Sequence, residues 1–539
     1  MTSAAITPRG SIEPAAAAHR LTRSAWIIGG IMLLLVVAFD LGPPLAFIDD
    51  WVYAWDVRHF DPLHIHFYPA GSALALVQVA LGWLVTLGQY DLRLLRLSEV
   101  VFILLAMYAV HNLSRRLGAD ATWSAIASVT VLVCPVFAAD ATTFMSDVPY
   151  VGLLSMAALG AVRWREGRRW IALCVAFATL ATLQRQFGAT MPFAVTVALL
   201  LYRRDGFTKR DALGLALLWA GCLAALAVPA LAGVTTPTQG YRLHALLTPS
   251  PLYVVLAFMF LPGVVGLALM PFLLGLAMTG QDRTPRDRTR LVVFALILVE
   301  IAVFLFAGND ILPGDVFQPR GFNLTKLVPS LKPQLYPTPF FLAIEVGSAA
   351  TMAYLVQGWR GLSPRRLGWP GAILLLVAGF QFLPLTVVQN LAYDRYYLPI
   401  VVVLVPLAAR AASGTSNHLA AGRFALALLA VMVVVYCVGE QDFQAWELAR
   451  DQTARLAYQQ ASPYDVNAGY EANAVYAEVP WYERTGELLA GAATSGLAGF
   501  SIDGPKAPKL VLQYAKPGDP RPGYSWDSLA PGKIIIRVP

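Results

Sequence analysis

Two adjacent carboxylates, Asp49 and Asp50, follow the first long apolar run in the stretch AFIDDWVYAWDVRHF, residues 46–60. A carboxylate can act as a general base, and paired carboxylates can hold a divalent cation such as Mg²⁺ or Mn²⁺. A helix beginning here would place Asp49, Tyr53 and Asp56 on one face and Asp50 about 100° away. One carboxylate would then face a cavity while the other binds a cation or caps the helix. The structural alternative is that Asp49 is the N-cap and Asp50 a first-turn acid.

Further polar side chains lie where other long apolar runs begin or end. If these runs cross a membrane, as argued below, all of these side chains lie on one side of it. They are Asp140, Asp147, Gln184, Arg185, Gln186, Asp394 and Arg395. Ionisable groups near the hydrocarbon boundary are costly and tend to mark function, so we predict that these side chains outline one cavity together with Tyr53 and Asp56. Arg185 lies on the side that cationic residues generally avoid and therefore needs an anion, either a phosphate or an acid such as Asp147. The structural alternative for Asp147 is a first-turn acid behind an N-cap serine.

Two loops carry weaker candidates. His64 and His66 in RHFDPLHIHFYP form a His-x-His pair that occurs in metal sites, although loop histidines are more often simply solvated. In a second loop, Arg320, Lys326 and Lys332 could bind an anionic headgroup or could be solvated surface residues. We predict that Arg320 and Lys326 join Arg185 and Arg395 in binding a phosphate group.

Composition identifies the class of protein. The 539 residues are 57% hydrophobic and only 14% charged, and the mean hydropathy is +0.59. Apolar runs of roughly 17–25 residues recur, the length needed to cross a hydrocarbon core about 30 Å thick. The sequence therefore predicts an all-α polytopic membrane protein. All four cysteines, Cys134, Cys174, Cys222 and Cys437, lie in apolar runs, which favours buried thiols over disulfides or a zinc site.

The distribution of Lys and Arg predicts the topology. Thirteen spans place nearly every basic cluster on the cytoplasmic side, with the N-terminus cytoplasmic and the C-terminus extracytoplasmic in the plasma (inner) membrane. The predicted spans are 22–41, 95–114, 121–139, 147–164, 168–184, 187–203, 211–233, 251–279, 290–307, 340–358, 370–389, 396–412 and 421–439. The apolar run 69–88 must then be a juxtamembrane or re-entrant segment. The first run is too long for a signal peptide, so we predict no cleavage. The positive-inside bias accounts for the net charge of +7 without a nucleic-acid partner.

Three regions are predicted outside the membrane: the loops 42–94 and 308–339, and the tail. The second loop is rich in Pro and reads as irregular. The tail begins with a helical pattern and ends with the strand-like runs KLVLQYA and KIIIRVP. We therefore divide the chain into a transmembrane domain, residues 1–440, and a small extracytoplasmic α/β domain, residues 441–539. The run 251–279 contains two prolines and should be kinked or tilted.

The candidate residues are acids and an unusual arginine around a predicted outer cavity. This combination favours one reaction: the transfer of a sugar from a polyprenyl-phosphate carrier to a hydroxyl of a lipid, glycan or protein. The acceptor hydroxyl needs a general base, and the departing lipid phosphate needs a cationic group or a divalent cation. A lipid-linked donor is natural where no nucleotide is available. The alternative is a transporter or flippase of a lipid-linked saccharide, which would place polar groups near mid-membrane; no pair of broken spans indicates one.

Several stretches resemble the multi-spanning C-type glycosyltransferases of family 39, which include the protein O-mannosyltransferases and the aminoarabinose transferase of lipid A. They are FIDDWVYAWDVRHF, RLLRLSEVVFILLAMYAVHNLSRRLG, PVFAADATTFMSDVPYVGLL, ATLQRQFG and YDRYYLP. The resemblance implies that Asp49 is the base or a metal-binding residue, with Asp50 beside it, and that Asp147 is the second motif acid. Many relatives have Glu in place of Asp50, so the resemblance leaves open which acid is the base.

Overall fold

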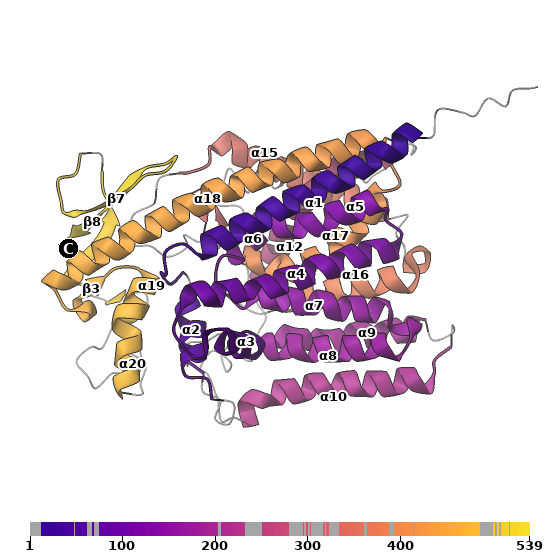
Figure 1. The fold of residues 1–539 in the computed structure, drawn as a ribbon, viewed down its shortest axis with the longest axis horizontal. Helices are drawn as coiled ribbons and strands as arrows, with labels where there is room; N and C mark the ends of the chain where they lie inside the picture. The colour runs from indigo at the N-terminus through magenta and orange to yellow at the C-terminus, as the bar shows by residue number, and fades with distance from the viewer. Residues whose placement is uncertain are drawn as a thin grey trace, which may run out of the picture.

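The computed structural model is mainly helical (Figure 1). It describes residues 12–47, 49–61, 67–68, 75–202, 206–231, 251–279, 295, 298–299, 302, 316–318, 320–322, 332, 334–359, 364–387, 393–415, 417–485, 500–501, 504–505, 508–516 and 518–538. Long helices run side by side through most of the molecule, as an apolar chain in lipid requires, because a helix satisfies its own backbone hydrogen bonds.

The main helices of the bundle coincide with the predicted spans, except that residues 290–307 lie mostly outside the described part. They are α1 (Ile12–Asp40), α4 (Leu92–Leu117), α5 (Ala121–Val133), α6 (Pro135–Asp140), α7 (Asp147–Val162), α8 (Arg168–Gln184), α9 (Met191–Leu201), α10 (Lys209–Leu231), α12 (Pro251–Leu269), α13 (Leu273–Thr279), α15 (Thr338–Trp359), α16 (Pro364–Val387), α17 (Leu398–Ala412) and α18 (His418–Gln460). Among the described residues, 8 helices are long and apolar enough to cross a membrane. The count of thirteen spans stays a prediction. The run 251–279, predicted to be kinked or tilted, is interrupted by a 3₁₀ turn containing Pro271 that separates α12 from α13.

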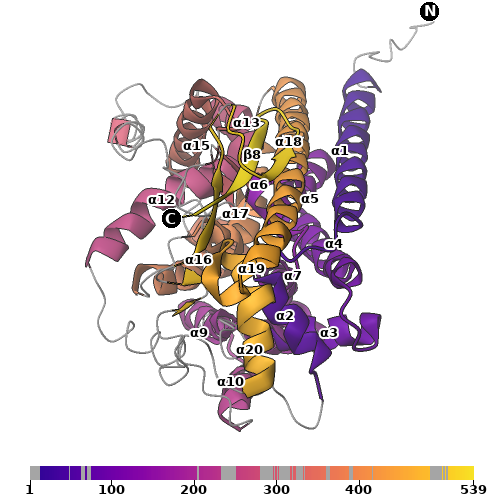
Figure 2. The ribbon, with the colours of Figure 1, turned by 90° about the vertical axis from the view of Figure 1, so that its left-hand side faces the viewer.

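Described basic residues from several clusters lie at one end of the bundle. Arg116 at the end of α4 forms a 2.7 Å ion pair with Glu166, which follows α7, and His418 at the start of α18 lies 2.7 Å from Asp120. The opposite end carries α2 (Asp50–Arg58), α3 (Leu76–Thr86) and the C-terminal elements (Figures 1 and 2). This segregation agrees with the predicted topology, while the orientation of the termini in the membrane stays a prediction.

Helix α3 forms from the apolar run that we excluded from the spans. Its 11 residues rise about 16 Å, roughly half of the hydrocarbon thickness. It packs against α2, α4 and α8 at the end of the bundle rather than crossing it. The interpretation of this run as a juxtamembrane segment therefore agrees with the structure.

The C-terminal elements grow out of α18, which continues 20 residues beyond the predicted domain boundary at residue 440. Four strands form one sheet in the order β3-β6-β8-β7. They are β3 (Val466–Asn467), β6 (Leu510–Tyr514), β7 (Gly523–Trp526) and β8 (Gly532–Arg537), and only β3 and β6 run parallel. The two strand-like runs predicted in the tail are confirmed as β6 and β8. The division into two domains stays a prediction.

Short elements complete the fold. Near the sheet lie α19 (Tyr470–Asn473), a π-helical turn (Ala474–Glu478), α20 (Val479–Thr485) and the strand pair β4 (Phe500–Ser501) and β5 (Gly504–Pro505). In the second loop, β1 (Phe317–Gln318) and β2 (Gly321–Phe322) form an antiparallel hairpin, so the prediction that this loop is wholly irregular is wrong. The 3₁₀ turn η5 (Asp394–Tyr397) leads into α17.

Candidate active site

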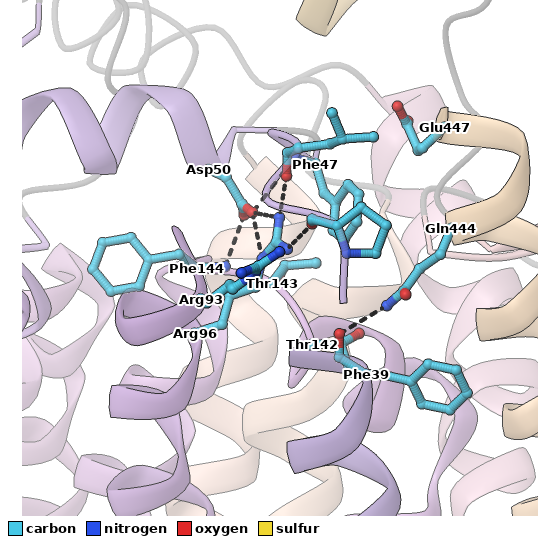
Figure 3. Close-up of polar contacts among 12 residues, drawn as sticks. Phe39, Phe47, Asp50, Arg93, Arg96, Thr142, Thr143, Phe144, Gln444 and Glu447 are labelled. Carbon is cyan, nitrogen blue, oxygen red and sulfur yellow. Dashed lines mark hydrogen bonds and ion pairs between the residues drawn. The ribbon is translucent and has the colours of Figure 1, made fainter. Parts of the chain in front are cut away.

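Asp50 is an anchor inside the protein (Figure 3). Its side chain is fully buried, and its Oδ1 accepts a 2.7 Å hydrogen bond from the amide of Phe144. Its Oδ2 accepts from Arg96 Nη2 at 2.7 Å and Nε at 3.1 Å, and from the amide of Phe47 at 3.4 Å. Burial raises the pKa of Asp50, and the charge and hydrogen bonds of Arg96 oppose this shift. Both oxygens are therefore engaged inside the protein.

Arg96 ties the first loop to α4. Besides Asp50 it donates to the carbonyls of Leu45 and Pro43, and its guanidinium lies 3.8 Å from the ring centroid of Phe47. It is fully buried. We did not predict this residue, although an arginine one turn inside an apolar helix, in RLLRLSEVV, is a signal that could have identified it.

Asp49 has a different environment from its neighbour. It occupies the N-cap position of α2, but its side chain caps no backbone amide. Instead, Oδ1 accepts a 2.7 Å hydrogen bond from the hydroxyl of Tyr470, and Oδ2 lies 3.9 Å from Nη2 of Arg395. The capping alternative is therefore wrong for this side chain. Asp49 is 22% exposed whereas Asp50 is 0% exposed, so only Asp49 is accessible to a substrate.

Arg185 and Asp147 form a second polar group. Nη2 of Arg185 lies 2.7 Å from Oδ2 of Asp147, and its Nη2 and Nε donate to the hydroxyl of Ser146 at 2.8 and 3.0 Å. The hydroxyl of Tyr53 lies 3.2 Å from the same Ser146 oxygen. Of the two anions that we considered for Arg185, the carboxylate of Asp147 is its partner in the structure.

Tyr396 joins the two groups. The guanidinium of Arg185 lies 5.1 Å from the centroid of its ring, and that of Arg395 lies 5.5 Å from the same centroid. Asp49, Asp147, Arg185 and Arg395 therefore converge, although they come from the start of α2, the start of α7, the end of α8 and η5. These four side chains are part of the larger set that we predicted to lie together.

Gln184, one of the two amides of the predicted pocket, stabilises the fold. The side-chain oxygen of Gln184 accepts a 3.1 Å hydrogen bond from the backbone amide of Gln78, and the side-chain NH₂ of Gln184 donates to the side-chain oxygen of Gln78 at 3.0 Å. Through these two bonds Gln184 fixes α3 to the end of α8. It also donates to the carbonyl of Ser146 at 3.3 Å. Gln186 is half-buried at the start of a 3₁₀ turn. Because Gln184 uses both ends of its amide on the protein, it positions the site rather than facing a ligand.

Asp56 and Asp394 also hold loops. Asp56 is 1% exposed and accepts a 2.6 Å hydrogen bond from the amide of Tyr68. Asp394 is fully buried and accepts from the amides of Val316 and Phe317 at 3.1 and 2.8 Å. Because both buried carboxylates accept from the backbone amides of loops, the structure favours a positioning role over the pocket lining that we predicted.

The remaining candidates contact other protein groups or lie outside the described residues. Arg320 is half-buried in the turn of the β1–β2 hairpin and donates to the carbonyl of Lys332. Lys332 is itself buried in an ion pair with Asp442 of α18, so it is neither solvated nor open to a headgroup, and both alternatives considered for it are wrong. Lys326, His64 and His66 lie outside the described residues.

The donor set near Asp49 does not fit a metal ion held by the acid pair. The oxygens of Asp50 accept from a guanidinium and two backbone amides, and those of Asp49 face a tyrosine hydroxyl and Arg395. In the part of the chain that is described, no group of three or more His, Cys, Asp or Glu side chains is placed to hold a metal. The guanidinium of Arg395 is the cation that the described structure places beside Asp49.

These features define a polytopic helical membrane protein with two acids, two arginines and several tyrosines gathered at one end of its bundle. Residues 77–232 match the profile of the family described as dolichyl-phosphate-mannose-protein mannosyltransferase. The matched segment contains Asp147 and Arg185, and the match confirms the family resemblance predicted from the sequence. No curated protein matches the chain.

Solved structures that are similar over most of the chain include the following three. ArnT from Cupriavidus metallidurans bound to undecaprenyl phosphate is 16% identical, with 95% of this chain and 97% of that chain covered and a TM-score of 0.38. Its apo state is 17% identical at the same coverage, with a TM-score of 0.40. The archaeal oligosaccharyltransferase AglB from Archaeoglobus fulgidus, in complex with an inhibitory peptide and a dolichol-phosphate, is 17% identical over 80% of this chain and 59% of that chain, with a TM-score of 0.38.

Proposed function

We propose that this chain is an integral-membrane glycosyltransferase that moves a sugar from a polyprenyl-phosphate-linked donor to an acceptor hydroxyl. The observation that carries the proposal is the position of Asp49, a partly exposed carboxylate whose Oδ2 lies 3.9 Å from the guanidinium of Arg395. A base beside a cation is the pair that this reaction needs. The match of residues 77–232 to the mannosyltransferase family supports the same reaction class.

The reaction assigns one task to each of these groups. Asp49 takes the proton of the acceptor hydroxyl as its oxygen bonds to C1 of the sugar. The bond between C1 and the phosphate oxygen breaks, and its electron pair stays on the lipid phosphate. Arg395 stabilises that growing negative charge, because a guanidinium pairs well with phosphate oxygens. A single displacement of this kind inverts the configuration at C1.

The Arg185–Asp147 pair positions the side chains around it. Because the two charges neutralise each other at 2.7 Å, Arg185 contributes less net charge to a bound phosphate than Arg395 does. Ser146 and Tyr396 on either side of Arg185 transmit its position to the rest of the site. We place the site on the extracytoplasmic face of the plasma membrane, with a lipid, glycan or protein as acceptor, from the positive-inside pattern.

The test uses the full-length chain in proteoliposomes with radiolabelled undecaprenyl-phosphate hexoses and pentoses. Release of undecaprenyl phosphate with label in a second product is the expected result, and Asp49→Asn should lower the rate about 10²–10⁴-fold. Asp465→Asn is the matched control, because that carboxylate pairs with Lys509 on the surface of the C-terminal elements. Label that crosses the bilayer with its phosphate bond intact would instead identify a flippase and overturn the proposal.

A further inference from the structure

Tyr470 reaches the candidate site from a distant part of the chain. It begins α19, 421 residues after Asp49, and its hydroxyl donates a 2.7 Å hydrogen bond to Oδ1 of that carboxylate. Arg395 approaches the other oxygen at 3.9 Å. The carboxylate therefore lies between a neutral donor from the C-terminal segment and a cation from η5.

The C-terminal segment is firmly seated at this point. The rings of Trp51, Trp55, Tyr68 and Tyr482 pack together in edge contacts with centroids 4.9–5.6 Å apart. The ring of Tyr470 joins this cluster at 6.3 Å from Trp51. Aromatic pairs at such separations stabilise a contact beyond the area that they bury. The aromatic cluster therefore fixes α19 against α2.

A buried ion pair supports α19 from its other side. Glu471, the residue after Tyr470, pairs with the buried Arg450 of α18, which also pairs with Glu447. Asn473 accepts from the amide of Ala468 at 2.9 Å, which closes the turn before the helix. With contacts on both sides, the hydroxyl of Tyr470 is held in place rather than free to rotate away from Asp49.

We infer that Tyr470 is a positioning residue of the transferase site, supplied by the C-terminal segment to orient Asp49 and to stabilise its charged form. This inference rests on the proposed function for its catalytic consequence. Burial and the charge of Asp49 hold the pKa of the Tyr470 hydroxyl well above its ordinary value, so it remains a donor across the working pH range. A hydrogen bond to a carboxylate favours the ionised form, so its loss should raise the pH at which Asp49 loses its proton.

Tyr470→Phe removes the hydroxyl and keeps the ring that packs against Trp51. Tyr476→Phe is the matched control, since it deletes a hydroxyl six residues later that donates to Asp451 at 2.8 Å. The first readout is the pH profile of kcat in the proteoliposome assay. We expect its acidic limb to move up by about one pH unit in Tyr470→Phe and to stay in place in the control.

The second readout does not depend on turnover. A water-soluble carbodiimide modifies carboxyl groups in their protonated form, and mass spectrometry can follow the modification of Asp49 against pH. We expect the midpoint of labelling to rise by about one pH unit in Tyr470→Phe only. Unchanged labelling and rate profiles in this variant would overturn the inference. A wild-type chain that transfers no sugar but shows the labelling shift would refute the proposed function and leave the positioning of Asp49 supported.

Discussion

Asparagine substitution of each adjacent acid should separate their roles. Asp50→Asn replaces a carboxylate that accepts from two amides and a bidentate guanidinium with a group that has one acceptor and an NH₂ donor. The buried cation of Arg96 then loses its counter-charge, which costs about 3–5 kcal/mol when one partner of a buried pair is removed. This is a large share of the stability of a typical domain, about 5–15 kcal/mol.

Asp49→Asn should mainly affect the transfer rate rather than the stability. Its amide oxygen can still accept from Tyr470, and its 3.9 Å contact with the buried Arg395 is longer than the 2.7 Å pair that Asp50 forms with Arg96. We therefore expect a smaller loss of stability than in Asp50→Asn. The same substitution removes the proposed base, so the transfer rate should fall about 10²–10⁴-fold.

The assay measures thermal unfolding by intrinsic fluorescence and sugar transfer on the same reconstituted preparations. A third variant, Asp50→Leu combined with Arg96→Met, provides the control, because apolar replacement of both partners of a buried pair is often close to neutral. This double variant should recover much of the stability lost in Asp50→Asn. An Asp50→Asn chain that is as stable as the wild type and inactive, beside an active Asp49→Asn chain, would refute the assignment of roles.

Three further predictions concern the rest of the site. Arg395→Ala should lower kcat, because Arg395 stabilises the negative charge that grows on the leaving phosphate, and Arg395→Lys should recover part of the loss in the same steady-state assay. Exchanging the charged pair, as Asp147→Arg with Arg185→Asp, should restore some of the stability lost in either single variant, measured by thermal unfolding. Burial raises the pKa of Asp56 well above 3.8, so wild-type stability should fall as the pH rises through the range between the unfolded and folded pKa values. Asp56→Asn keeps an acceptor for the amide of Tyr68 and should remove this slope in unfolding curves measured from pH 4 to 9.

The helices of the bundle were predictable because apolar runs are a local property of the chain. Lipid has no hydrogen-bonding groups, so each long apolar run must form a helix wherever it packs. The exclusion of residues 69–88 also followed from a chain-wide rule, since the basic clusters must fall on one side. The strands β6 and β8 carried enough β-branched and apolar residues to be identified alone. Their pairing with β3 required tertiary information.

The detailed roles of the site residues depend on contacts between distant segments. Sequence placed Asp49 and Asp50 correctly at the start of a helix, but which of them faces the interior depends on how α2 packs on Arg96 of α4. Nothing near Tyr470 in the sequence indicates a partner 421 residues away. Lys332 shows the same limit, because its burial beside Asp442 results from the path of α18 beyond the bundle.

Of the two acids after the first span, Asp50 has a structural role and Asp49 is the proposed base. Successive residues at a helix start point about 100° apart, so two adjacent acids cannot both face one pocket. Asp50 turns inward and fastens the first loop to α4 through Arg96, and this attachment fixes the backbone from which Asp49 projects toward Tyr470. An activity screen alone would find both acids essential, since loss of Asp50 also displaces Asp49. Only a paired measurement of stability distinguishes the acid that reacts from the acid that holds it in place.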